Sequence, residues 1–223
     1  MSKFVFQVTP QNPELGSVTP HTITSKCDYL RRHFNRIERV YQEESDELLI
    51  ACQSEQERTK DHEDDSEHNY SYSDAIREIE FFSLRMHRYS AILASYAYLE
   101  NSMSKLCGKY YESMDLPLKP EEVRGEGIVK FRIYLEKLAK IDLETVNKNW
   151  SHLTTLNLIR NCIVHADGDA NLIKNSSKLI GIINKSKNLS FIEEQLIMMD
   201  ASYISSTVDT IQGFLLHLFE AGQ

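Results

Sequence analysis

Arg160, Asn161 and His165 stand in a largely apolar stretch that runs from Leu156 to Gly168. An arginine guanidinium presents a planar fork of donors that fits a phosphate group, and it stays charged at physiological pH. A histidine imidazole titrates near neutral pH, so it can accept or donate a proton during a reaction. Together these side chains indicate a site that grips a phosphate and moves protons beside it.

The elements that carry these residues limit how they act together. We expect a helix over residues 149–166, ended by a cap at Gly168. On such a helix Asn161 and His165 share a face, whereas Arg160 and His165 differ by about 140°. Three arrangements would bring them to one phosphate: the long arginine side chain bends around the helix, the helix loosens at His165, or a second copy of the chain completes the site.

Apolar residues recur with helical spacing along most of the chain, which predicts an all-α antiparallel bundle of long helices. Besides the motif helix, we expect helices over about 25–52, 71–107, 128–141, 171–184 and 201–221. Gly108 is the expected end of the second of these. Just before the last helix, residues 189–192 and 195–199 form either a small hairpin through Glu193 and Glu194 or an irregular crossing.

The predicted organisation is an extended N-terminal arm, residues 1–24, and a single helical domain, residues 25–223. Prolines interrupt the arm, and no linker divides the remainder. Residues 53–72 form an expected acidic exposed loop, and its potential metal ligands lack a rigid spacing, so we expect neither metal nor cofactor. Those side chains are His62, Asp64, Asp65 and His68. Four scattered cysteines without a C-x-x-C pair are expected to be buried free thiols.

Arg160 and Asn161, followed after three residues by His165, resemble the R-X4-H signature of the HEPN superfamily. The upstream stretch from Tyr96 to Leu106, YAYLENSMSKL, is also similar to HEPN proteins of bacterial defence systems. The resemblance spans about residues 73–219. It implies a HEPN-like helical bundle and a metal-independent endoribonuclease of bacterial defence or of a toxin–antitoxin system. It also implies a homodimer in which Arg160, Asn161 and His165 of both subunits line one cleft.

RNA supplies its own nucleophile, the 2′-hydroxyl, so this chemistry requires no cofactor. His165 is the expected acid or base, Arg160 the expected phosphate ligand, and Asn161 the residue that orients the imidazole or the phosphate. Glu100 is either a hydrogen-bond acceptor that supports the motif helix or a surface carboxylate. The implied partners are an RNA substrate and an antitoxin or other defence protein.

The whole chain of 223 residues has a net charge of −8. Residues 145–192, however, contain six basic and two acidic side chains, a net charge of +4, which is the local footprint expected of an RNA-binding surface. Candidate contacts to RNA are Lys148, Lys174, Lys178 and Trp150, the last of which either stacks on a base or packs in the core. No signal-peptide pattern or apolar membrane span is present, so we expect a cytoplasmic protein.

The alternative function is a non-catalytic HEPN module that binds RNA, a nucleotide or a protein partner and mediates dimerisation. HEPN toxins paired with nucleotidyltransferases often carry a tyrosine two residues after the histidine. In this chain that position is Asp167. Regulation by tyrosine adenylylation is therefore not expected.

Overall fold

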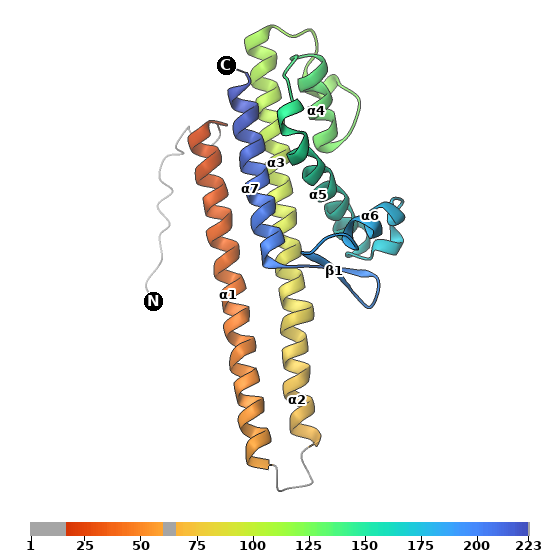
Figure 1. Ribbon diagram of the computed structural model, residues 1–223. Coiled ribbons are helices and arrows are strands. Elements are labelled where there is room, and N and C mark those ends of the chain that lie inside the picture. The colour runs from red at the N-terminus through yellow and green to blue at the C-terminus, as the bar shows by residue number, and fades with distance from the viewer. Residues whose placement is uncertain (1–16, 60–65, 223) are drawn as a thin grey trace, which may run out of the picture.

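The computed structural model describes residues 17–59 and 66–222, and for residues 59–71 it does not describe the side chains. The structure is 78% helical. The predicted all-α fold with a small hairpin before the last helix is confirmed (Figure 1). Four long helices dominate: α1 (Pro20–Thr59), α3 (Leu84–Met114), α5 (Asn147–Ala166) and α7 (Ala201–Glu220).

Helix α7 lies at the centre of the bundle, against α1, α3 and α5. Its inward face carries Phe214, Leu215 and Leu218, none of which is exposed to solvent. Burying each such side chain contributes about 1.5–3 kcal/mol to folding. The apolar spacing of α7 therefore holds together the helices on either side of it, including the motif helix α5.

The first helix begins earlier and ends later than predicted. Pro20 occupies the first turn of α1, where a proline is tolerated, and the Thr22 amide donates to Thr19 Oγ1 at 3.2 Å as a cap. The predicted extended arm, residues 1–24, is thus wrong at its C-terminal end, and residues 1–16 lie outside the described residues. The expectation of an arm there stays a prediction.

The predicted acidic loop over 53–72 is also shorter than expected. Helix α1 continues to Thr59 and α2 (Ser66–Arg77) begins soon afterwards. Only residues 60–65 between them are without a described structure, so three of the potential metal ligands lie outside the described residues: His62, Asp64 and Asp65. His68 lies in α2, and its side chain is not described.

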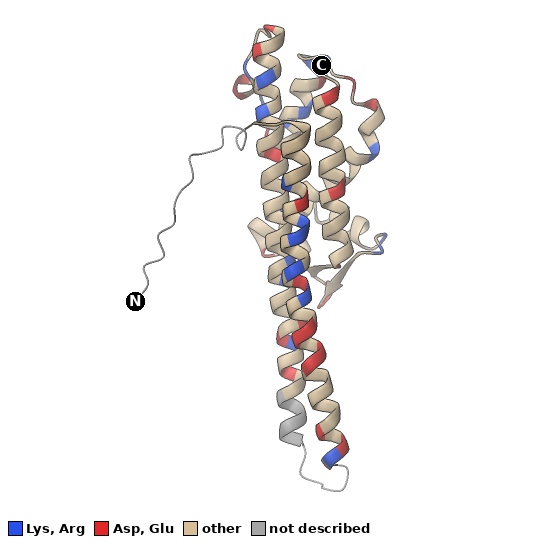
Figure 2. Cartoon of the chain, turned by 90° about the vertical axis from the view of Figure 1, so that its left-hand side faces the viewer, with Lys and Arg blue, Asp and Glu red and all other residues tan. Residues whose placement is uncertain are grey.

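Helix α2 continues through a π-helical turn, η2 (Glu78–Ser83), into α3, and together they form one rod antiparallel to α1 (Figure 1). The prediction that Gly108 ends this helix is wrong. The helix runs on to Met114 and ends where Asp115 adopts a left-handed conformation, φ 50°. Acidic residues gather on the half of α1 that lies furthest from α7, so this part of α1 is negatively charged (Figure 2).

Smaller elements lie on the other side of α3. Helix α4 (Gly127–Lys137) packs on α3, and α6 (Ser176–Ile183) packs on α5. Strands β1 (Leu189–Ile192) and β2 (Leu196–Met199) pair antiparallel, with Leu189 opposite Met199. The hairpin alternative was therefore correct, and its turn places Glu193 and Glu194 at φ 52° and 62°. Three short 3-10 turns complete this side: Pro120–Glu122, Glu144–Val146 and Ala170–Leu172.

The cysteines only partly follow the prediction. Cys27, Cys107 and Cys162 are buried free thiols, whereas Cys52 is half-buried on α1. Among the described helices, none combines the length and the apolar content that a membrane span requires.

Candidate functional site

The motif helix α5 stays regular through all three candidate residues. It ends after Ala166, and Asp167 is the first residue with a left-handed backbone, φ 47°. Gly168 follows at φ 85°, so the predicted cap lies one residue earlier than expected. Because the helix does not loosen at His165, only two of the three arrangements considered from the sequence remain.

The end of α5 is fixed to its neighbours by several contacts. The Ile197 amide of β2 donates to the Gly168 carbonyl at 3.0 Å, and the Tyr89 hydroxyl of α3 donates to the Ile197 carbonyl at 2.7 Å. A Cβ atom at Gly168 would lie 1.9 Å from the Tyr89 hydroxyl oxygen. Only glycine fits this position. The absence of a side chain allows α3, β2 and the end of α5 to pack closely together near His165.

Arg85 adds a charged contact to the same turn. Its side chain is 10% exposed and donates from Nη1 to the Asp167 carbonyl at 3.2 Å, with Asp167 Oδ2 at 3.6 Å. Its Cζ lies 5.3 Å from the Tyr89 ring centroid. Burial raises the pKa of Tyr89 to about 12, and the hydrogen bond and charge of Arg85 oppose that rise. The turn after His165 is consequently held by both polar and aromatic contacts.

Arg160 is held in place by two contacts. Its Cζ lies 5.2 Å from the ring centroid of Tyr96, a buried residue of α3, and its Nη1 donates to Asn161 Oδ1 at 2.9 Å. A guanidinium has five N–H donors, so these contacts orient Arg160 and leave donors for a phosphate. Asn161 therefore supports the arginine in this structure rather than the imidazole.

Glu100 interacts electrostatically with Tyr96, the residue whose ring Arg160 contacts. A Cβ atom at Gly127, the first residue of α4, would lie 2.7 Å from the Tyr96 hydroxyl oxygen and 3.3 Å from Glu100 Oε1. Burial raises the pKa of Tyr96, and the Glu100 charge raises it further. Glu100 is half-buried one turn along α3 from Tyr96. The sequence did not point to Tyr96 as a functional residue, although it lies in the stretch that resembles defence proteins.

His165 is exposed in the last turn of α5. Within the described chain, no hydrogen bond or ion pair joins it to Arg160. Val164, the residue before it, is 47% exposed, and Leu172, in the 3-10 turn that follows α5, is 73% exposed. A single copy of the chain thus holds Arg160 against α3 and presents His165 to solvent on a different face of the same helix.

The candidate RNA contacts divide between the two ends of α5. Lys148 is exposed in the first turn, about 25 Å from His165 along the helix axis at 1.5 Å per residue. Lys174 and Lys178 are exposed near the other end, on the segment and helix that follow the motif. The Trp150 ring has Phe214 at 5.8 Å and the Arg132 guanidinium at 4.7 Å, so it packs against the core.

Among the described residues, no group of three histidine, cysteine or carboxylate side chains has the proximity that a metal ion needs. No protein-family profile, curated protein or solved structure matches this chain.

Proposed function

We propose that this protein is a metal-independent endoribonuclease of the HEPN type, with an active site built from two copies of α5. The observation that carries the proposal is that one regular helix presents both an oriented Arg160 and an exposed His165. The R-X4-H resemblance supplies the reaction class. In keeping with that resemblance, the protein acts on cellular or phage RNA in the cytoplasm of a bacterium and is restrained by a partner protein.

The residues divide the reaction between them. Arg160 binds the scissile phosphate and stabilises the charge that develops on its non-bridging oxygens. His165 removes the proton of the 2′-hydroxyl or protonates the departing 5′-oxygen, a step worth about 10²–10⁴-fold. The 2′-oxygen forms a bond to phosphorus while the bond to the 5′-oxygen breaks. The products are a 2′,3′-cyclic phosphate and a 5′-hydroxyl.

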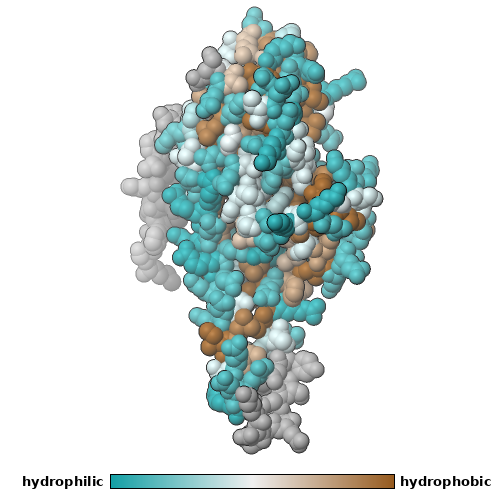
Figure 3. All heavy atoms as spheres, in the orientation of Figure 1, coloured by the Kyte–Doolittle hydropathy of each residue, from teal (hydrophilic) through white to brown (hydrophobic). Residues whose placement is uncertain are grey.

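The geometry of α5 supports a site made from two copies. Arg160 and His165 differ by about 140° around a regular helix, so one copy directs them apart. A second copy related by a two-fold axis brings its own His165 towards the first Arg160. The exposed Val164, next to His165 in the chain, gives such a contact an apolar component. Apolar surface is also visible around α6 and the hairpin (Figure 3).

The experiment incubates the protein with total RNA in EDTA, beside Arg160→Ala and His165→Ala. We expect fragments with 5′-hydroxyl ends from the wild type, and a loss of at least about 100-fold in both variants. The matched controls are Arg124→Ala and His33→Ala, which remove an exposed arginine and an exposed histidine elsewhere in the chain. We expect both controls to cleave RNA at the wild-type rate. Cleavage that requires a metal ion contradicts the mechanism. Intact RNA that stays bound without cleavage supports the non-catalytic module instead.

A further inference from the structure

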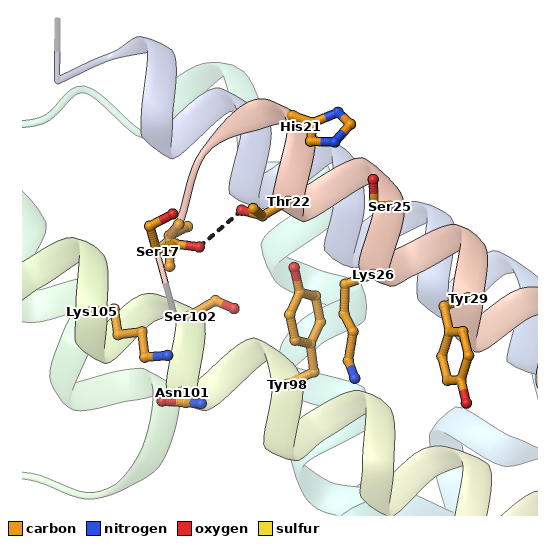
Figure 4. Close-up of a pocket in the computed structure, with 11 residues that line it drawn as sticks. Ser17, His21, Thr22, Ser25, Lys26, Tyr29, Tyr98, Asn101, Ser102 and Lys105 are labelled. Atoms are coloured by element: carbon orange, nitrogen blue, oxygen red, sulfur yellow. Dashed lines mark hydrogen bonds between the residues drawn. The ribbon is translucent and has the colours of Figure 1, made fainter. Parts of the chain in front are cut away.

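A cavity of about 640 Å³ lies between the first turns of α1 and the middle of α3 (Figure 4). It is separate from the motif. Tyr98 lines the cavity, whereas Tyr96 contacts Arg160, and two residues along a helix correspond to about 200° of rotation. The cavity therefore opens on the face of α3 that points away from α5, and no function assigned so far uses it.

The charge of this cavity is positive. Lys26 of α1 and Lys105 of α3 line it, and among the residues that the structure describes no aspartate or glutamate does. Neither lysine forms an ion pair with any of the described residues, in a chain whose net charge is −8. Figure 4 shows the Lys26 side chain extending from α1 towards α3, and the Lys105 side chain lying along α3 near Asn101 and Ser102. Two unpaired cations facing one hollow favour an anionic ligand.

The polar groups around the lysines fit a phosphate. Asn101 adds an exposed amide donor to the lining, whereas the Thr22 hydroxyl donates to the Ser17 carbonyl at 2.9 Å and Ser102 is hydrogen-bonded to Tyr98. The cavity also borders the N-terminal turn of α1, which contains no acidic residue to neutralise the positive end of the helix dipole. The helix dipole, the two ammonium groups and the Asn101 amide therefore all favour a bound anion.

An aromatic surface adjoins these donors. Tyr29 is 57% exposed, and Lys26 Nζ lies 5.5 Å from its ring centroid. The Tyr29 ring lies nearly parallel to that of His33, at 6.3 Å and an interplanar angle of 6°. An exposed ring beside a phosphate-binding group is suited to stacking a base. Burial raises the pKa of Tyr98, on the opposite wall, to about 12, so its hydroxyl keeps its proton at neutral pH.

We propose that this cavity binds a nucleoside phosphate. Lys26 and Lys105 hold the phosphate groups, and Tyr29 stacks on the base. The cavity volume of about 640 Å³ lies within the range of about 300–1,000 Å³ that is typical of small-molecule sites. This inference does not depend on the endoribonuclease proposal, because no residue of α5 lines the cavity.

Calorimetric titration of the full chain in EDTA tests this inference. The probes are ADP, GDP and UDP, with pyrophosphate and adenosine as partial ligands. We expect one diphosphate nucleotide per chain, and a weakening of about 10-fold in each of Lys26→Ala and Lys105→Ala, since each removes a charged contact. Tyr29→Ala weakens the nucleotide by about 5-fold and leaves pyrophosphate unchanged, because it removes only stacking.

Two controls separate this site from the motif. Lys137→Ala removes an exposed lysine of α4 and leaves nucleotide affinity unchanged, and Arg160→Ala also binds normally. The inference is overturned if no nucleotide binds up to about 1 mM. It is equally overturned if both lysine variants bind as tightly as the wild type, if pyrophosphate matches ADP in affinity, or if Arg160→Ala abolishes binding.

Discussion

The guanidinium of Arg160 lies over the ring of Tyr96, with its Cζ 5.2 Å from the ring centroid. Because Tyr96 is only 3% exposed, this contact ties the candidate phosphate ligand to the rigid interior of α3. A surface arginine normally samples many rotamers and pays an entropic cost when it binds. In this protein the contact with Tyr96 of α3 already restricts the Arg160 side chain, so less conformational entropy is lost when a phosphate binds.

The Tyr96 contact makes a prediction about cleavage. Tyr96→Phe keeps the ring beneath Arg160 and is expected to retain cleavage within about threefold, whereas Tyr96→Leu removes the cation–π contact, worth about 1–2 kcal/mol, and lowers the rate about 10-fold. Single-turnover cleavage of one defined RNA measures both. Equal rates for the two variants, with both folded by circular dichroism, contradict a positioning role for the ring.

We expect that replacing Gly168 lowers the stability of the fold by a large amount. Gly168→Ala forces a left-handed alanine at φ 85° and brings its Cβ to 1.9 Å from the Tyr89 hydroxyl oxygen, so we expect a loss of about 2–4 kcal/mol in the free energy of unfolding. Gly108→Ala is the matched control. Apart from its own helical turn, no described atom lies within 4 Å of its new Cβ, so this change in a helix interior stabilises by about 0.5–1 kcal/mol. Urea denaturation measures both, and equal effects contradict the packing described.

The lowered pKa values of two half-buried histidines predict that stability depends on pH. Burial lowers the pKa of His87 and of His152 from the ordinary value of 6.5. Each therefore takes up its proton more readily in the unfolded chain, so the free energy of unfolding falls as pH drops below about 6.5 towards the lower folded pKa. Urea denaturation between about pH 7.5 and 5.5 measures the slope.

His152→Gln tests the contribution of one of these histidines. His152 Nε2 lies 3.0 Å from Thr207 Oγ1, and a glutamine amide can keep a hydrogen bond there without titrating. The variant is expected to lose part of the pH slope. An unchanged slope assigns the pH dependence to other groups.

The cysteines predict selective labelling. Burial raises the pKa of Cys107 to about 12 and those of Cys27 and Cys162 to about 11, and the thiolate is the reactive form. Cys52 is half-buried on α1, so we expect it alone to react with a thiol reagent in the native protein. All four react after unfolding. Native labelling that persists in Cys52→Ser contradicts this burial pattern.

The helices could be predicted because their apolar residues repeat every three or four positions. The ends of the helices were harder to predict, because favourable packing can extend a helix past a residue, such as glycine, that often ends one. A glycine inside a helix costs only about 1 kcal/mol, and the burial of Leu106, Cys107 and Tyr110 on either side of Gly108 outweighs that cost. The π-helical turn before α3 could not be predicted, because the apolar spacing around Glu78–Ser83 does not distinguish it from an α-helix.

The motif residues could also be selected from their types, but their partners could not. The contact of Arg160 with Tyr96 depends on how α5 packs on α3, and spacing along one helix carries no information about that packing. The same limit applies to Trp150, whose neighbours Phe214 and Arg132 come from α7 and α4. The cavity between α1 and α3 likewise combines residues that are far apart in the chain.

The central claim is that Arg160 of one copy and His165 of another act on the same phosphate. It is tested most directly by mixing Arg160→Ala with His165→Ala under conditions that exchange subunits, and measuring RNA cleavage in EDTA. Half of the dimers are then mixed, and each keeps one arginine–histidine pair across the interface, so the account predicts roughly one quarter of the wild-type rate from two inactive proteins. A mixture no more active than either variant alone contradicts it.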